Sequence, residues 1–572
     1  MNGIIQQITH SDIKSIKSDL IAGLTVAVML IPQGMAYAML AGLPPIYGLY
    51  AGFIPLIVYP LFGSSKELSV GPVAVVSIIV LAGISPFATP GTTEFIQLAI
   101  LTSLVAGIIQ LILSFLKMGF LVNFLSNPVI SGFTAAAALI IGLSQLKYLF
   151  GVELPRTSGV IGMIRDLIQS VDKVHLLSFV MGGIAVAFIL LLKRIKKAFP
   201  ASLVAIIIGT ALVYAFNWND LGVLIVENVP SSLPAVTFSF IDMDMVLKVL
   251  PVALIICLIS FIESLAIAKT IAARKEDESI DANKELLGLG LSKVVGSFFQ
   301  AFPNTGSFTR SAINNDAGAK TGLSSIFAGI FVGLTLLFLT PLFYFMPKPV
   351  LAAIVIAAVF GLIDIPYARN LFRFDRKDFY VFMATFLLTL FLGVQQGVFA
   401  GIILSVLMIV YESSRPHYAI LGKLSGTNSF RSIERFPEAT MDSEILVFRY
   451  DEDLYFGNAE HFHDSIMNSI EGHPKTRLLV LNASSINRID STGLAKFERM
   501  IHKLNKMDII FKISGLRGEV RDLLVKTKVM DLIGLENNYL SIQDAINGFK
   551  KNDDSARLSR EYASQSNKKI KI

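Results

Sequence analysis

The chain has 572 residues, of which 53% are hydrophobic and only 16% are charged, and its mean hydropathy is +0.64. This composition excludes an ordinary soluble globular protein and predicts a membrane protein. The net charge of +6 does not call for a nucleic-acid partner, and the single cysteine, Cys257, excludes an internal disulfide framework.

Apolar runs of spanning length follow one another along residues 20–411, after a short segment 1–19 that we expect to be cytoplasmic. The first run, Leu20–Ala41, has no small-residue cleavage site after it, so we interpret it as a spanning helix and not as a removed signal peptide. The first seven spans are expected at Leu20–Met39, Tyr47–Phe62, Pro72–Ile84, Leu98–Leu116, Val129–Phe150, Leu177–Leu192 and Ala201–Phe216. The second seven are expected at Met245–Thr270, Leu286–Phe302, Gly306–Ala317, Ser324–Phe345, Pro349–Ile363, Asp378–Phe391 and Val394–Tyr411.

The positions of the basic residues support this count of about fourteen spans. With the N-terminus inside, every even-numbered span ends in the cytoplasm. Those ends carry Lys66, Lys117, Lys193, Arg194, Lys196, Lys197, Arg274, Lys275, Lys320, Arg373, Arg376 and Lys377. The opposite loops have fewer cations, such as Lys147 and Lys348. The pattern predicts a multi-pass protein of the inner (plasma) membrane, with both chain ends in the cytoplasm.

Two of the segments are too short to cross a bilayer core of roughly 30 Å. Pro72–Ile84 and Gly306–Ala317 each cover roughly 20 Å at 1.5 Å per residue, and each is third in its group of seven. The groups occupy residues 20–216 and 245–411, and an odd number of spans inverts the second copy in the membrane. We therefore expect two half-helices whose N-termini meet near the midplane, where they could bind an anion.

The character of the chain changes after the last span. Residues 412–444 read as a polar connector, residues 445–549 as a small α/β domain, and residues 550–572 as a disordered tail. Strands are expected at Ile445–Tyr450, Arg477–Asn482 and Ile509–Ser514. Helices are expected at Ala459–Ile470, Thr492–Leu504, Val520–Thr527 and Ile542–Phe549.

Strongly ionisable side chains are scarce within the spans, and two of those in the second group are candidates for the site. Glu263 lies deep in the eighth span and Arg310 in the second half-helix. A charge at membrane depth is costly and faces a cavity or a partner. We expect the two side chains to approach each other, so that their charges offset one another when no substrate is bound. A purely structural buried pair is the alternative.

Uncharged donors complete the expected anion site. Gln33 and Tyr37 lie four residues apart, on one face of the first span. The backbone N–H groups at the starts of the two half-helices would add donors and roughly half a positive charge each. The expected anion-binding set is Gln33, Tyr37, Gly71, Pro72, Val73, Ala74, Gly306, Ser307, Phe308 and Arg310.

Several long motifs, in order, resemble the sulfate permease (SulP) family of anion transporters. They are PQGMAYAMLAGLPPIYGLYAGFIP at 32–55, SVGPVAVVS at 69–77, GSFTRSAINNDAGAKT at 306–321 and RPHYAILGKLSGTNSFR at 415–431. The C-terminal domain resembles a STAS domain through residues 446–462 and 481–494. The resemblance implies a fold of seven plus seven inverted repeats, with a core domain moving against a gate domain, as a homodimer.

The coupling ion is predicted from the same comparison. Sodium-coupled bicarbonate importers of this family have an aspartate and, four residues later, a hydroxyl on the eighth helix, where this chain has Glu263 and Ile267. They also have a threonine where this chain has Phe308. A dianion entering against 100 mV faces about 4.6 kcal/mol, so its uptake needs cations. We therefore expect a sulfate:proton symporter in which Glu263 carries the proton.

Other functions stay open at this point. The chain could import a C4-dicarboxylate or bicarbonate, or act as an uncoupled anion exchanger or channel, or as a sensor whose STAS domain is the output. Related domains are phosphorylated in the loop that here carries Ser491 and Thr492, although these residues could instead cap the helix. The sequence shows no nucleophile–base set, metal-ligand cluster or phosphate loop, so we expect no enzyme, no cofactor and no metal.

Overall fold

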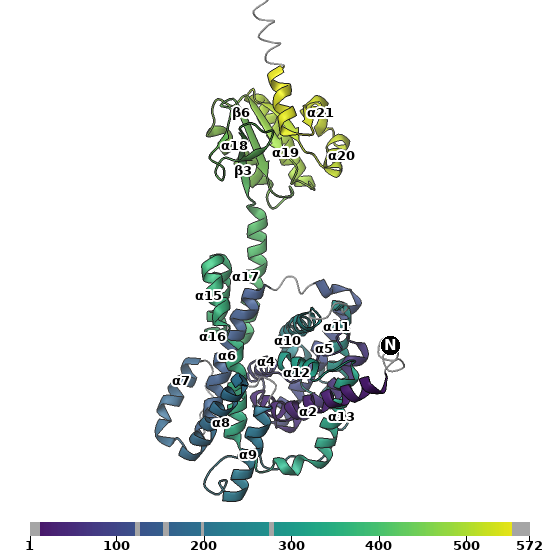
Figure 1. Cartoon of the computed structure of the whole chain (residues 1–572), viewed down its shortest axis with the longest axis vertical. Coiled ribbons are helices and arrows are strands. Elements are labelled where there is room, and N and C mark those ends of the chain that lie inside the picture. Colours follow the sequence, from purple (N-terminus) through teal and green to yellow (C-terminus); the bar gives the residue numbers. More distant parts are fainter. Residues whose placement is uncertain (1–11, 121–125, 153–159, 196–199, 274–278, 552–572) are drawn as a thin grey trace, which may run out of the picture. The chain divides into compact units, whose positions relative to one another are not determined.

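The computed structural model describes residues 12–120, 126–152, 160–195, 200–273 and 279–551. They divide into two compact units, 1–405 and 406–572, of which the first is helical (Figure 1). The first half of the helical unit contains α2 (Ile13–Leu40), α3 (Ile46–Phe62), α4 (Ala74–Ile84), α5 (Thr93–Phe115), α6 (Asn127–Phe150), α7 (Val160–Gln169), η2 (Val171–Lys173), α8 (Leu176–Ile195) and α9 (Ala201–Phe216). The second half contains α10 (Met243–Ala272), α11 (Ala282–Phe298), α12 (Phe308–Asp316), α13 (Leu323–Phe338), η3 (Thr340–Phe343), α14 (Lys348–Val359), η4 (Phe360–Leu362), α15 (Ile365–Phe374), α16 (Arg376–Leu392) and α17 (Val394–Ser414).

All fourteen predicted spans correspond to helices. Within the described residues, six helices are long and apolar enough to cross a membrane, and further apolar helices are shorter. Side chains at the N-terminal ends of several helices fix where they begin, because they accept hydrogen bonds from otherwise unpaired backbone N–H groups. These caps are Asp12 for α2, Thr92 for α5, Asp242 for α10, Asp281 for α11 and Asp375 for α16.

Helix contacts repeat between the two halves of the unit. α5 contacts α11 as α13 contacts α3, and α2 contacts α13 as α10 contacts α5. Likewise α6 contacts α16 as α14 contacts α8. These equivalences relate each helix of the first half to the helix eight labels later, as an internal repeat requires.

The contacts also sort the helices into two groups, which Figure 1 shows apart. The core group consists of α2–α5 and α10–α13, the first four spans of each half. The gate group consists of α6, α8, α9, α14 and α16, joined by α17, whose Gly401 packs against Val129 and Thr385. Between the groups, α2 contacts α9 and α14, and α4 contacts α6.

Two short helices were absent from the prediction. α7 follows the fifth span of the first half, and α15 follows the fifth span of the second, so they occupy matched positions. Both are amphipathic and too short to span a membrane, with apolar side chains such as Ile161, Ile168 and Phe374 exposed. A search for spanning runs does not detect such helices.

The second unit is an α/β domain built on a mixed sheet. Its strands are β3 (Tyr418–Leu424), β4 (Phe430–Ser432), β5 (Ala439–Thr440), β6 (Ile445–Tyr450), β7 (Leu478–Asn482), β8 (Ile510–Ser514) and β9 (Asn538–Tyr539). The order is β4-β3-β6-β7-β8-β9, with β6 to β9 parallel and β3 antiparallel to β6. The helices are α18 (Ala459–Glu471), α19 (Ser491–Lys506), α20 (Gly518–Lys526), α21 (Val529–Ile533), the short η5 (Leu535–Asn537) and a helix over 542–551.

The sheet includes part of the predicted connector. β3, β4 and β5 lie within 412–444, and β3 pairs with β6 from Tyr418↔Tyr450 to Ile420↔Phe448. β4 and β5 are only three and two residues long, and β3 (YAILGKL) was not recognised without the strands with which it pairs. Most of the predicted tail, 552–572, lies outside the described residues, as do Lys196, Lys197, Arg274 and Lys275 of the charge analysis.

Candidate functional site

Two short strands bring the half-helices together. β1 (Val70–Gly71) directly precedes α4, and β2 (Thr305–Gly306) directly precedes α12. They pair antiparallel, with Val70 opposite Gly306 and Gly71 opposite Thr305. Equivalent segments of inverted repeats run in opposite directions, so this pairing matches the predicted inversion and joins the two helix starts.

Both helix starts lack a compensating side chain. Val73 is the N-cap residue of α4 and Ser307 is the N-cap residue of α12. Each has an extended backbone conformation and makes no side-chain cap hydrogen bond. Neither first turn contains an acidic residue. Because the first N–H groups of a helix have no partner within it, two partial positive charges point out of these starts.

Arg310 is buried one turn into α12, with 0% of its surface exposed. Its Nη1 donates to the Pro72 carbonyl oxygen at 3.0 Å, and its Nε donates to the Ser69 hydroxyl at 3.4 Å. The remaining nitrogen, Nη2, is buried and has no hydrogen-bond partner among the described residues. A guanidinium that is held by two bonds and keeps one donor unused is suited to an anion.

Some backbone N–H groups at the helix starts already donate hydrogen bonds within the protein. The N–H of Ser307 donates to the Ser69 carbonyl at 3.0 Å, and the N–H of Gly306 donates to the Ser264 hydroxyl at 2.9 Å. Thr305 Oγ1 donates to the Ser260 carbonyl at 3.0 Å, which ties β2 to α10. The strand pairing therefore already occupies the N–H of Ser307, so this N–H is not free for an anion, and a role of Ser307 in the site stays a prediction.

Glu263 lies on α10, beside the serine that holds β2. Its Oε2 is buried and has no hydrogen-bond partner among the described residues. No ion pair joins Glu263 to Arg310 in this part of the chain, although each lies within electrostatic range of the other. The expected direct pair is therefore replaced by a longer-range electrostatic interaction. Glu263 Oε2 and Arg310 Nη2 both lack a hydrogen-bond partner among the described residues.

Gln33 and Tyr37 lie on α2 and are 5% and 6% exposed. α2 contacts both α4 and α12, and Tyr37 is within electrostatic range of Arg310 and Glu263. Glycines at positions 34 and 48 let α2 and α3 approach each other, since a Cβ at Gly34 would meet the Gly48 carbonyl at 3.0 Å. The side chain of Phe308, by contrast, is 52% exposed.

Sequence reasoning missed the hydroxyl residues that build this site. Ser69, Ser260, Ser264, Thr305 and Ser311 are all buried and bonded within it. The signal was the spacing of Ser260 and Ser264, four residues apart in an otherwise apolar run. Such a pair indicates a polar neighbour on one helix face.

In the STAS loop, the residue that caps α19 is Asp490 and not Ser491 or Thr492. Asp490 caps α19 by accepting from the Gly493 N–H at 2.7 Å, and its second oxygen accepts from the Phe456 N–H at 2.9 Å. Ser491 and Thr492 are exposed, and their hydroxyls have no hydrogen bond to a described residue. These two residues therefore do not cap the helix.

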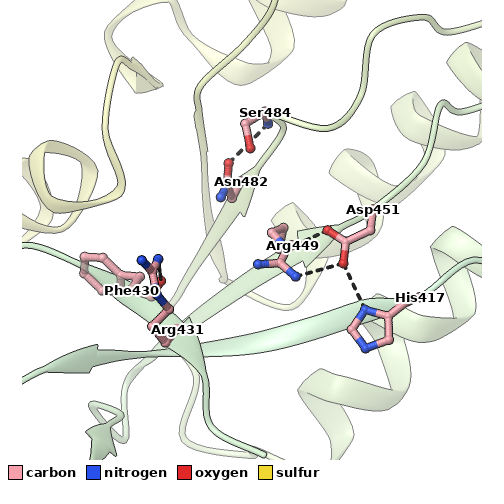
Figure 2. Close-up of polar contacts among 7 residues, drawn as sticks. All are labelled: His417, Phe430, Arg431, Arg449, Asp451, Asn482 and Ser484. Atoms are coloured by element: carbon pink, nitrogen blue, oxygen red, sulfur yellow. Dashed lines mark hydrogen bonds and ion pairs between the residues drawn. The ribbon is translucent and has the colours of Figure 1, made fainter. Parts of the chain in front are cut away.

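A second polar cluster joins β3 to β6. Figure 2 shows Asp451 between Arg449 and His417, with the His417 Nδ1 to Asp451 Oδ2 distance at 2.9 Å. Burial alone would raise the pKa of Asp451, but hydrogen bonds from Arg449 and His417 hold it below its usual range. Elsewhere in the described domain, Glu460, His463 and Asp464 have ligand atoms within 4.8 Å of one another. Glu460 also pairs with Lys496, and this exposed group carries no argument for a metal.

Comparison with known proteins identifies the family. Residues 16–385 match the model of the sulfate permease family, and residues 436–545 match the STAS domain. The chain is 39% identical to "Sulfate transporter 4.1, chloroplastic" of Arabidopsis thaliana over 549 residues, which cover 93% of this chain and 79% of that one. It is 34% identical to "High affinity sulfate transporter 2" of Stylosanthes hamata, covering 94% of this chain and 84% of that one.

A solved structure supports the same fold. The structure of SLC26A9 matches with a TM-score of 0.86 and 24% identity, covering 97% of this chain and 93% of that chain. The predicted helical membrane fold with a C-terminal STAS domain is thereby confirmed, and its homologues are transporters and not enzymes. The chain is a multi-pass membrane transporter that belongs to the sulfate permease family.

Proposed function

We propose that the protein is a sulfate:proton symporter that binds sulfate between the starts of α4 and α12. The observation that carries this proposal is the free, buried Nη2 of Arg310, which lies beside two uncapped helix starts. A Cβ at Gly71 would lie 3.1 Å from Nη2, so the glycine keeps the space in front of that donor open. The names of the relatives support sulfate as the anion.

Gln33 and Tyr37 would complete the site without adding charge. Both are buried on α2, and neither side chain has a hydrogen bond to a described residue. The amide of Gln33 and the hydroxyl of Tyr37 are thus available to donate hydrogen bonds to an oxyanion. On the backbone, we assign the free donors to the N–H groups of Val73, Ala74 and Phe308.

Glu263 would couple the proton to the anion. While ionised, its carboxylate lowers the positive potential that Arg310 and the helix starts create. A proton on Glu263 removes that opposition, so anion and proton favour each other's binding. Deprotonation on the inner side would then help to expel the anion, and the buried Oε2 without a partner is consistent with a group that gains and loses a proton.

We further propose alternating access in a homodimer of an inner (plasma) membrane. All the assigned site residues lie in the core group, which leaves the gate group as the surface against which the core moves. Basic residues at the ends of even-numbered spans, such as Lys66, Lys117 and Lys320, favour a cytoplasmic N-terminus and STAS domain. Accessibility labelling of single cysteines in these loops, from each side of intact cells, tests that orientation.

The proposal is tested by uptake of radiolabelled sulfate into proteoliposomes, with and without an inward proton gradient. We expect the wild type to accumulate sulfate when a gradient is present, and Glu263→Gln to lose that dependence. Glu94→Gln, which removes an exposed carboxylate from the first turn of α5, is the control and should behave as wild type. Equal, pH-independent uptake in all three proteins would favour a channel or exchanger, and movement of dicarboxylate or bicarbonate alone would replace the substrate.

A second candidate role concerns regulation through the STAS loop. Because Asp490 provides the cap of α19, the hydroxyls of Ser491 and Thr492 are exposed and chemically available at a helix start, where a phosphate is stabilised. We propose that either residue is a phosphorylation site. Mass spectrometry of the protein from cells, compared with Ser491→Ala and Thr492→Val variants, tests this; transport that changes in neither variant would remove the loop from regulation.

A further inference from the structure

The core group also buries a lysine that the proposed mechanism does not use. Lys293 lies on α11 with 0% of its surface exposed, and its Nζ donates to Gln110 Oε1 at 3.1 Å. Among the residues that the structure describes, no carboxylate lies within ion-pair distance of Nζ. An ammonium withdrawn from water without a counter-charge is costly, so a permanent charge at this position is disfavoured.

Hydrogen-bonded residues connect this lysine to β2, the strand that precedes α12. Gln110 Nε2 donates to the Ser260 hydroxyl at 2.9 Å and to the Cys257 carbonyl at 3.0 Å. The Ser260 carbonyl accepts from Thr305 Oγ1 at 3.0 Å, and Thr305 is the first residue of β2. The lysine network therefore ends on the strand from which α12 and Arg310 begin.

The other titratable groups around α11 are few. From α10, the Cys257 thiol lies within electrostatic range of Lys293. From α5, the facing groups are Gln110 and Gly107, which carry no charge. On the α3 side, Tyr59 donates to Glu285 at 2.7 Å, about two turns earlier along α11. Within the described residues, the opposite charge that would stabilise a protonated Lys293 is thus missing.

We propose that Lys293 takes up a second proton, which travels with sulfate. This inference rests on the proposed sulfate:proton symport. The free amine of Lys293 binds a proton from the outer side when the dianion occupies the site, and the ammonium releases it on the inner side after the anion leaves. Together with the proton on Glu263, it cancels both charges of sulfate, so that one transport cycle moves no net charge.

The test is the sulfate accumulation ratio at equilibrium in proteoliposomes, measured against the pH difference and the membrane potential. Each coupled proton contributes about tenfold accumulation per pH unit. Two protons give the wild type roughly hundredfold per pH unit, with no dependence on potential. Lys293→Met should give about tenfold per pH unit, and an inside-negative potential should lower its accumulation about tenfold for each 60 mV.

Two controls separate proton uptake from a structural role. Lys293→Arg keeps a charge that does not titrate, so it should also give about tenfold per pH unit. Lys284→Met removes an exposed lysine from the same helix and should keep the wild-type slope. Thermal unfolding checks that each variant is folded, and Gln110→Leu, which removes the acceptor of the ammonium, replaces Lys293→Met if that variant fails to fold.

The outcomes distinguish this inference from the proposed function. A wild type that accumulates sulfate with only tenfold per pH unit, or a Lys293→Met variant with the wild-type slope, overturns the role of Lys293 and leaves symport intact. A Lys293→Arg variant that restores the hundredfold slope means that the residue is a fixed cation, which also overturns it. A wild type that does not accumulate sulfate under any gradient rejects the proposed function itself.

Discussion

Replacing Gly71 with alanine should weaken sulfate binding without removing any functional side chain. The new Cβ would lie 3.1 Å from Arg310 Nη2 and 3.3 Å from Leu30 Cδ1, closer than ordinary van der Waals contact. One of the two must move by a few tenths of an ångström. Both side chains are fully buried, but Nη2 has no protein hydrogen bond to hold it, so we expect the guanidinium to shift.

The size of the effect follows from the bond that is disturbed. A hydrogen bond to a charged group contributes about 1.5–3 kcal/mol, which corresponds to roughly tenfold to hundredfold in affinity. We expect a partial loss, and hence a KM for sulfate uptake about tenfold higher. Gly183→Ala is the matched control, since a Cβ there meets no atom within 4 Å. A folded Gly71→Ala protein with the wild-type KM would refute the assignment of Nη2 as an anion donor.

Three further variants probe the site and the STAS domain. Arg310→Lys keeps the positive charge but loses the fixed, forked geometry of the guanidinium, and we expect its sulfate uptake to fall at least tenfold, as measured by initial rates. Asp490→Ala removes the α19 cap and should lower the stability of the STAS domain by about 1 kcal/mol in thermal unfolding of the full chain; an unchanged melting temperature would contradict the cap. Asp451→Asn tests pH dependence. Because Arg449 and His417 depress the pKa of Asp451 in the folded state, this carboxylate stabilises the domain above its unfolded pKa of about 3.9, and the contribution disappears as the pH falls through the lower, folded value. The variant should therefore be less stable than wild type at pH 7 and similar to it near pH 2, followed by acid unfolding; the same deficit at both pH values would contradict this reasoning.

The sequence was sufficient to predict the helices and strands that consist of strongly hydrophobic runs. Each of the fourteen spans has a helix, and the two segments predicted as half-helices are short helices, α4 and α12. The parallel strands β6, β7 and β8 were predicted to within one residue, because they are buried and apolar. The strands β3 to β5 and the helices α7 and α15 were missed. β3 to β5 lie in the predicted connector and pair with one another, and α7 and α15 are amphipathic and too short to span a membrane.

The site could be predicted in its composition but not in its hydrogen bonding. Burial of Arg310 follows from the cost of a charge in an apolar region. Which N–H groups remain free depends on the register of β1 and β2, which joins Val70 to Gly306 across more than two hundred residues. No local pattern contains that register, so the use of the Ser307 N–H and the absence of a Glu263 pair with Arg310 required the three-dimensional structure.

If transport follows the proposed alternating access, the hydrogen bonds indicate which part of the protein moves. β1 and β2 pair with each other, Ser264 and Thr305 tie β2 to α10, and Arg310 donates to Pro72. Both helix starts, Arg310 and α10 therefore belong to one hydrogen-bonded body. Opening the site by separating the half-helices would break these buried bonds, each worth about 1 kcal/mol and more when left unpaired. Displacing the whole core group against α14 and α6 breaks none of them. We therefore expect a covalent cross-link between α2 and α14, made with introduced cysteines because Cys257 is buried, to abolish uptake while sulfate binding persists in equilibrium titration. Continued uptake by the fully cross-linked protein would mean that the half-helices themselves separate.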